Sequence, residues 1–148
     1  MNILISTITR NDAHKLDNYY EQISNIPKQF KDYKFYLSIY ENDSNDDTVE
    51  KLNSYDFSMF EGHKVVCEKL DYPFAESVET EENIKILSEC RNKAIFNSGF
   101  LDICDRVLVI ESDVFFRPRA IRSLLNFNTG SDLTDLLFCI SICSMWFE

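Results

Sequence analysis

The stretch Arg106-Val107-Leu108-Val109-Ile110-Glu111-Ser112-Asp113 combines the clearest strand pattern of this chain with a pair of acidic residues at the end of that strand. Its first part is a short apolar run rich in β-branched residues, which predicts a strand that is buried on both faces. Its end carries two carboxylates, Glu111 and Asp113, and the strand period of two places them on the same side. A ligand site is therefore expected where this strand ends.

The rest of the chain alternates between strand and helix patterns. Strands are predicted at residues 2–9, 35–40 and 64–70, with a last candidate at 136–142. Helices are predicted from a cap at Asn11 and Asp12 to a stop at Pro27, and at residues 48–55, 83–96 and 118–125, with an acidic loop at 73–82. This alternation predicts an α/β fold with a mostly parallel sheet flanked by helices. In such folds ligands bind beyond the carboxyl ends of the strands.

Length and composition narrow the class of protein. A chain of 148 residues with 45% hydrophobic content can bury a single core, so we expect one domain over residues 1–148. Its 25 acidic and 15 basic residues give a formal net charge of −10, which repels phosphate backbones and anionic membrane surfaces. Nucleic acid is therefore not an expected partner. The sequence shows no secretory leader and no apolar run that could span a membrane, so a soluble, cytoplasmic protein is expected.

The sequence lacks the local signatures of several enzyme classes. It contains no glycine-rich phosphate loop and no signature of the serine, cysteine or zinc hydrolases. His14 and His63 have no partner pattern, and no catalytic base or nucleophile is assigned. The cysteines are odd in number and form no C-x-x-C pair, so buried reduced thiols are expected. They are Cys67, Cys90, Cys104, Cys139 and Cys143.

Glu111 and Asp113 form the first candidate site. Two carboxylates on one side make a hard-oxygen site for Mg²⁺ or Mn²⁺. A metal there would bridge the phosphates of a nucleotide and neutralise the charge that grows on a leaving diphosphate. The alternative is a helix-capping Asp113 with a solvated Glu111.

Two further groups of residues are candidates for ligand binding. Glu41 and Asp43 follow the second strand, where a carboxylate can accept hydrogen bonds from a ribose or a base, although an ordinary acidic turn is the alternative. Their neighbours Ser44, Asp46 and Asp47 are explained by capping of the next helix. Arg91 lies on the helix before the metal strand, where a guanidinium can bind a phosphate or steady the acidic site. Its alternative is a surface ion pair with a neighbouring Glu.

Three blocks of sequence carry a resemblance to a known family. They are Leu37-Ser38-Ile39-Tyr40-Glu41-Asn42-Asp43-Ser44-Asn45-Asp46-Asp47-Thr48, Arg91-Asn92-Lys93-Ala94 and Asp105-Arg106-Val107-Leu108-Val109-Ile110-Glu111-Ser112-Asp113-Val114-Phe115-Phe116. In their order and rough spacing, over about residues 36–125, they resemble the fungal capsule-associated α-1,3-mannosyltransferases, glycosyltransferase family 69.

The resemblance implies a GT-A fold, Mn²⁺ or Mg²⁺ as cofactor, and transfer of a sugar, expected to be mannose, to a glycan acceptor. The donor would be a nucleotide sugar, GDP-mannose or a UDP-sugar. The matching positions assign the metal to Asp113 and Glu111, and the donor to Glu41, Asp43, Arg91 and Ser112. Glu41 and Asp43 would lie beside the nucleoside and Arg91 beside the diphosphate. The motif here is one residue longer than the family pattern, which favours Asp113 over Glu111 as the metal ligand.

The end of the sequence carries a further expectation. GT-A enzymes place acceptor recognition after the strand that follows the metal motif, whereas this chain closes with the apolar stretch Met145-Trp146-Phe147-Glu148. An incomplete GT-A domain is therefore expected, with a partner chain covering the apolar end. Two other functions stay open, namely a non-catalytic GT-A-like binding module and another metal-dependent nucleotidyl or phosphotransfer enzyme.

Overall fold

The computed structural model describes residues 1–72 and 80–126. The chain divides into two compact units, Met1–Asp113 and Val114–Glu148. The first unit contains the four described strands and every residue predicted for the site. In the second, the described residues contain helix α4 (Pro118–Asn126), which begins at the proline predicted to open it.

Several predictions fall outside the described residues. They concern the strand at 136–142, Cys139 and Cys143, and the apolar end that a partner chain would cover. The expectation of one domain over residues 1–148 also stays a prediction.

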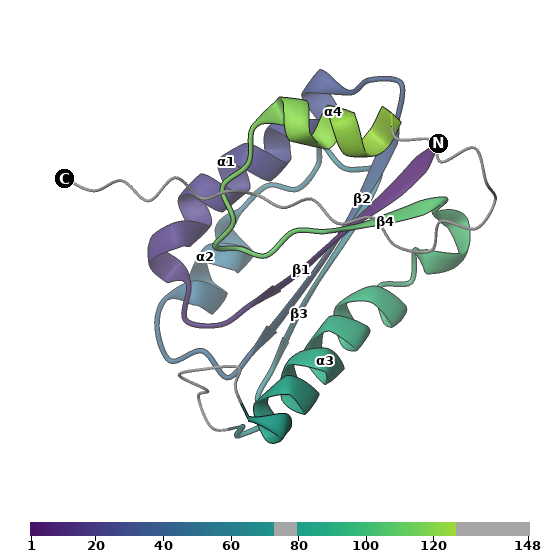
Figure 1. Cartoon of the computed structure of the whole chain (residues 1–148). Coiled ribbons are helices and arrows are strands. Elements are labelled where there is room, and N and C mark those ends of the chain that lie inside the picture. The colour runs from purple at the N-terminus through teal and green to yellow at the C-terminus, as the bar shows by residue number, and fades with distance from the viewer. Residues whose placement is uncertain (73–79, 127–148) are drawn as a thin grey trace. The chain divides into compact units, whose positions relative to one another are not determined.

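Four parallel strands form the sheet of the first unit, in the order β3-β2-β1-β4 (Figure 1). The strands are β1 (Asn2–Thr9), β2 (Lys34–Asn42), β3 (Gly62–Glu68) and β4 (Arg106–Val109). Ile5 of β1 is in register with Leu37 of β2 on one side and with Leu108 of β4 on the other. Because the strands run in one direction, their carboxyl ends meet at one edge, called the carboxyl edge below. The predicted α/β class with a parallel sheet flanked by helices is confirmed.

Helices cover both faces of this sheet. Figure 1 shows α1 (Ala13–Gln29) and α2 (Thr48–Ser54) on one face and α3 (Glu81–Phe96) on the other, with the short helix η1 (Leu101–Ile103) before β4. Leu16, Tyr19 and Ile23 recur at helical spacing in α1 and are buried. On the other face, Cys90 and Ala94 of α3 pack against Tyr40 of β2. Burial on both faces explains why β1 and β2 consist mainly of apolar residues.

Helix α1 continues past Pro27, which was wrongly predicted to end it. Proline lacks a backbone N–H, but so close to the end of a helix this removes a single hydrogen bond. Ile23 and Ile26 are buried in the last turns, and Phe30 N donates to Ile26 O at 3.0 Å. This packing keeps the chain helical to Gln29.

The predicted burial of β4 is also wrong. Arg106, Val107 and Val109 are exposed, and the exposed fraction of Val109 is 49%. In the described part of the chain β4 pairs with β1 alone and is an edge strand. An apolar run does not by itself distinguish an edge strand from a central one. Ile110, which follows the strand and leads into the site, is buried.

Smaller differences concern element ends and thiols. β3 lies two residues earlier than predicted, and α3 takes in the end of the predicted acidic loop. Thr80 Oγ1 accepts a hydrogen bond from Asn83 N at 3.2 Å, which caps α3. The three described cysteines are free thiols, as expected. Cys90 is buried and Cys104 partly buried, but Cys67 is exposed because it lies on the other edge strand, β3.

Candidate functional site

The loops that follow β1 and β2 are bound to each other at the carboxyl edge. Asn11 N donates to Ser44 Oγ at 2.9 Å, and Asn45 N donates to Asn11 Oδ1 at 2.8 Å. Asn11 has a φ of 55°, a conformation that asparagine adopts more readily than most residues. These reciprocal bonds fix two walls of the candidate site.

Asp46 caps both helices that leave these loops. Its Oδ1 accepts a hydrogen bond from Thr48 N at 3.0 Å, at the start of α2, and its Oδ2 accepts one from Ala13 N at 3.1 Å, at the start of α1. Asp12 occupies the N-cap position of α1, as predicted, but its side chain makes no cap bond, and the side chain of Asn11 binds the other loop. The carboxylate of Asp12 instead lines the pocket described next and binds the Ser112 hydroxyl.

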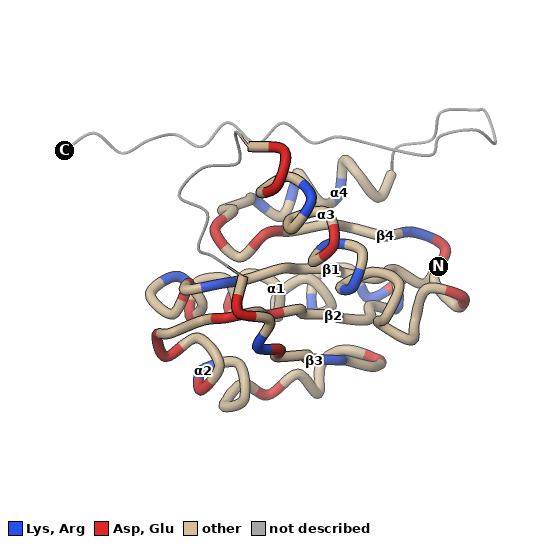
Figure 2. Tube along the Cα trace, turned by 90° about the horizontal axis from the view of Figure 1, so that it is seen from below, with Lys and Arg blue, Asp and Glu red and all other residues tan. Residues whose placement is uncertain are grey.

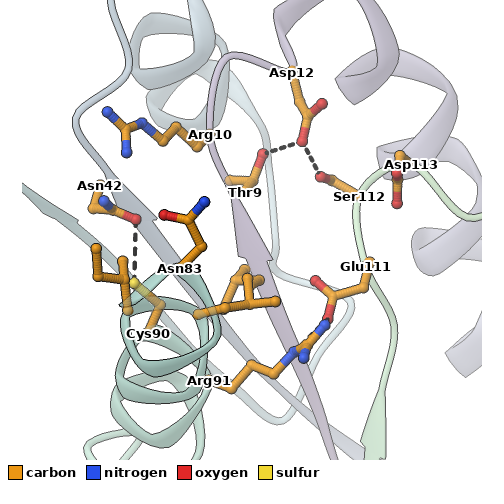
Figure 3. Close-up of a pocket in the computed structure, with 13 residues that line it drawn as sticks. Thr9, Arg10, Asp12, Asn42, Asn83, Cys90, Arg91, Glu111, Ser112 and Asp113 are labelled. Carbon is orange, nitrogen blue, oxygen red and sulfur yellow. Dashed lines mark hydrogen bonds and ion pairs between the residues drawn. The ribbon is translucent and has the colours of Figure 1, made fainter. Parts of the chain in front are cut away.

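A pocket of about 290 Å³ with both charged and apolar lining residues lies at the carboxyl edge, lined by the ends of β1 and β2, by α3 and by the segment after β4 (Figure 3). Its polar lining includes Thr9 at the end of β1, Arg10 and Asp12 after that strand, Arg91 of α3, and Glu111, Ser112 and Asp113 after β4. Four residues that the sequence assigned to a site therefore share one pocket. They are Arg91, Glu111, Ser112 and Asp113.

Arg91 binds the carboxylate of Glu111 within this pocket. Arg91 Nε and Nη2 lie 2.9 and 2.8 Å from Glu111 Oε1. The side chain of Glu111 is 25% exposed, and burial raises its pKa above the ordinary value. Arg91 counteracts that rise, while the charges of Asp113 and Asp12 add to it. Arg91 thus forms an ion pair with a Glu, which was the alternative to a phosphate contact. Its partner, Glu111, belongs to the predicted metal motif.

Ser112 holds the turn after β4 in place. Its side chain is buried, and its hydroxyl donates to Asp12 Oδ2, which also accepts from Thr9 Oγ1 at 3.1 Å. Glu111 and Asp113 lie beyond the end of the strand, so the strand period does not place them. Both nevertheless line the same pocket, because the turn at residues 112 and 113 brings the exposed Asp113 back to it.

Acidic side chains gather at the carboxyl edge. Figure 2 shows red segments after β2 and after β4, on the side of the sheet away from the N-terminus. The first pocket is lined by the carboxylates of Asp12, Glu111 and Asp113 and by the cations of Arg10 and Arg91. A site of this charge needs additional cations to accept a phosphate ligand.

The donor set of the pocket fits a metal that is shared with a ligand. Among residues 1–72 and 80–126, no group of three or more His, Cys, Asp or Glu side chains could hold a metal ion alone. Glu111 and Asp113 offer carboxylate oxygens on one pocket wall. Mg²⁺ is commonly bound by one or two carboxylates together with water and substrate phosphates, so two carboxylates meet that requirement.

Asp43 lies in a second cavity, of about 550 Å³, also at the carboxyl edge. Its Oδ1 accepts hydrogen bonds from Leu70 N and Asp71 N at 2.7 and 2.8 Å, and its Oδ2 accepts one from Tyr72 N at 3.2 Å. Burial raises the pKa of Asp43, but hydrogen bonds from the adjacent Asn42 and from these N–H groups lower it below its ordinary value. The carboxylate therefore orders the segment after β3, and its contact with a nucleoside stays a prediction.

Glu41 lines the same second cavity from the end of β2. It is 2% exposed, and its Oε1 accepts a hydrogen bond from Ser44 N at 2.8 Å. Although Cys67 as a whole residue is exposed, partial desolvation of its thiol, and then the nearby charge of Glu41, raise the pKa of the thiol to about 11. Cys67 is therefore protonated at neutral pH. The six predicted site residues are divided between two cavities, with Glu41 and Asp43 in one and the remaining four in the other.

Sequence reasoning missed the contribution of β1 to the site. Thr9, Arg10 and Asp12 line the first pocket, yet none was assigned to a ligand. The signal was present, because the rule that ligands bind beyond the carboxyl ends of parallel strands applies to β1 as it does to β2 and β4. The capping interpretation of Asp12 concealed it. Asn42 and Asn83, which also line the pocket, carried no comparable signal.

The fold and the site together define an α/β protein with a pocket, lined by charged and apolar residues, at the carboxyl edge of a parallel sheet. The sequence model of the family described as Cryptococcal mannosyltransferase 1 matches residues 2–148, and the chain belongs to this family. The resemblance based on the three sequence blocks is thereby confirmed. No curated protein and no solved structure matches the chain. Among the described residues, no helix combines the length and the apolar character needed to cross a membrane.

Proposed function

We propose that the chain binds a nucleotide sugar together with a divalent metal and transfers mannose from it to a glycan acceptor. Membership of the Cryptococcal mannosyltransferase 1 family supports the reaction class. The observation that carries the proposal is the single pocket lined by Arg91, Glu111, Ser112 and Asp113. It combines carboxylate oxygens with a guanidinium, the groups that bind a metal and a diphosphate.

Each pocket residue has a distinct role in this proposal. Asp113, which is exposed, is the principal metal ligand, and Glu111 is the second. A bound Mn²⁺ or Mg²⁺ neutralises the charge that develops on the leaving diphosphate. Arg91 neutralises the charge of Glu111 and holds its carboxylate in place through their ion pair. Because Arg91 also lines the pocket, its guanidinium can contact a bound diphosphate. Ser112, held by Asp12, keeps the two acidic residues of the turn in place.

Calorimetric titration tests the proposal directly. Wild-type protein is titrated with GDP-mannose and with a UDP-sugar, with and without Mn²⁺. We expect binding that requires the metal, and a loss of about tenfold or more in affinity in Asp113→Ala, because one of two protein ligands of the metal is removed. Asp32→Ala removes an exposed carboxylate between α1 and β2, at the opposite edge of the sheet, and is the matched control.

The same experiment separates the three candidate functions. Absence of metal-dependent binding in the wild type, or equal binding in Asp113→Ala, contradicts the proposal. Donor binding without release of GDP or free mannose over long incubation favours a binding module. Tighter binding of a free nucleoside triphosphate than of any nucleotide sugar favours a nucleotidyl or phosphotransfer enzyme.

A further inference from the structure

The two cavities at the carboxyl edge have one residue in common. Among the described residues, Arg10 alone lines both. It directly follows the last residue of β1, the central strand that pairs with both β2 and β4. Figure 3 shows Arg10 and Asn42 on one side of Thr9, and Asp12, Ser112 and Asp113 on the other. Arg10 therefore lies between the part of the site that follows β2 and the part that follows β4.

Cavity size favours a ligand that extends across both parts. Pockets that bury drug-sized ligands usually measure about 300–1,000 Å³. The first cavity, at about 290 Å³, is at the lower limit of this range, whereas the second, at about 550 Å³, lies inside it. A nucleotide sugar is larger than most drugs and has a nucleoside, a diphosphate and a sugar in line. A ligand of this length that places its diphosphate near Glu111 and Asp113 would extend from the first cavity into the second.

The distribution of charge indicates which group lies at the junction. Carboxylates predominate in the second cavity, where Glu41, Asp43, Glu68 and Asp71 accompany Arg10 and Lys69. In the first cavity, Arg91 is already bound to Glu111. A cation stabilises an anionic diphosphate that passes between two acidic cavities, and Arg10 is the cation that lines both of them.

The chain also orients the Arg10 side chain. Arg10 Nη2 donates to the carbonyl oxygen of Tyr72 at 2.7 Å. Tyr72 N in turn donates to Asp43 Oδ2 at 3.2 Å. Asp43 thus fixes the segment on which the guanidinium rests. The planar fork of an arginine guanidinium matches two phosphate oxygens.

We infer that the two cavities form one elongated donor site and that Arg10 binds the diphosphate at their junction. The nucleoside lies on the Glu41 side, and the sugar lies on the side of Glu111 and Asp113. This inference rests on the proposed function and adds to it a residue that the family resemblance did not assign. Asp43 becomes a positioning residue that acts through Tyr72 and Arg10.

The test compares ligands with and without phosphate. Guanosine, GDP and UDP are titrated in the presence of Mn²⁺ into the wild type, Arg10→Gln, Arg10→Lys and Lys31→Gln, with nucleoside binding followed by NMR. Lys31→Gln makes the same change of charge at an exposed position between α1 and β2, at the opposite edge of the sheet. Far-UV circular dichroism and thermal unfolding establish that each variant is folded.

We expect Arg10→Gln to weaken diphosphate binding about tenfold or more, since a charge-assisted hydrogen bond is removed. Guanosine binding should change less than twofold, Arg10→Lys should retain part of the affinity, and Lys31→Gln should match the wild type. Diphosphate affinity unchanged in Arg10→Gln, or an equal loss for guanosine, overturns this inference alone. Failure of the wild type to bind GDP and UDP overturns the proposed function as well.

Discussion

Replacing Asp46 with alanine should destabilise two helices at once. Asp46 Oδ1 accepts a hydrogen bond from Thr48 N at the start of α2, and Oδ2 accepts one from Ala13 N at the start of α1. Removing a single capping side chain costs about 1 kcal/mol. Because two helix starts lose their acceptor together, we expect the free energy of unfolding to fall by about 2 kcal/mol in Asp46→Ala.

Urea unfolding followed by far-UV circular dichroism measures this loss, and the neighbouring residue provides a matched control. Asp47 occupies the N-cap position of α2 but makes no side-chain cap bond. Asp47→Ala, which removes the same charge, should change the free energy of unfolding by less than about 0.5 kcal/mol. Asp46→Asn retains one acceptor oxygen and should lose about half as much as Asp46→Ala.

The pH dependence of this loss follows from the pKa of Asp46. Burial raises that pKa, but hydrogen bonds from the Thr48 side chain, Thr48 N and Ala13 N lower it below its ordinary value. The ionised carboxylate therefore stabilises the fold above the unfolded pKa of about 3.9, and its contribution is lost as the pH falls through the lower folded pKa. The difference between the wild type and Asp46→Ala should shrink accordingly. Equal losses in Asp46→Ala and Asp47→Ala, or a difference that does not change between neutral and acidic pH, would refute the double-cap reasoning.

Two further substitutions test single hydrogen bonds by the same unfolding measurement. Thr80→Ala removes the cap that accepts from Asn83 N and should cost about 1 kcal/mol, whereas Thr80→Ser should cost little; equal losses would contradict the cap. Tyr19→Phe removes the buried hydroxyl that pairs with Thr7 Oγ1 and should cost about 1–2 kcal/mol. Tyr20→Phe, which removes an exposed hydroxyl, should cost less, and a reversed order would argue against the buried pair.

Local patterns predicted the elements of the fold well, because each depends on neighbours in sequence. The strand at residues 2–9 and the start of the helix at Thr48 were found at their observed positions. The environment of an element was harder to predict. Val107 and Val109 have the composition of a buried strand, but strand order places β4 at the edge of the described sheet. Pro27 stays inside α1 because burial of Ile26 outweighs the loss of one hydrogen bond.

The site was also predicted only in part, because the sequence pattern shows local features and not contacts between distant residues. The rule about the carboxyl ends of parallel strands led to Glu111 and Asp113, which do share a pocket. Asp12 was obscured because the helix it precedes takes its cap from Asp46, 34 positions further along the sequence. A sequence pattern does not reveal such a distant donor–acceptor pair. Asp43 was predicted beside a nucleoside, while the structure shows its carboxylate bound to three backbone N–H groups.

The attachment of β4 to β1 has a consequence for every measurement of affinity. At the edge of the sheet where the strands begin, opposite the carboxyl edge, Asn2 N donates to Asp105 Oδ2 at 2.7 Å, across 103 positions of the chain. β4 carries residues 111–113 to the pocket, so local opening of this one pairing removes a pocket wall while β1, β2 and β3 keep their mutual bonds. Apparent affinity is then the intrinsic affinity multiplied by the fraction of molecules with β4 docked. Asp105 lies at the edge of the sheet opposite the pocket. A substitution there that lowers the fraction of molecules with β4 docked should weaken ligand binding by the same factor.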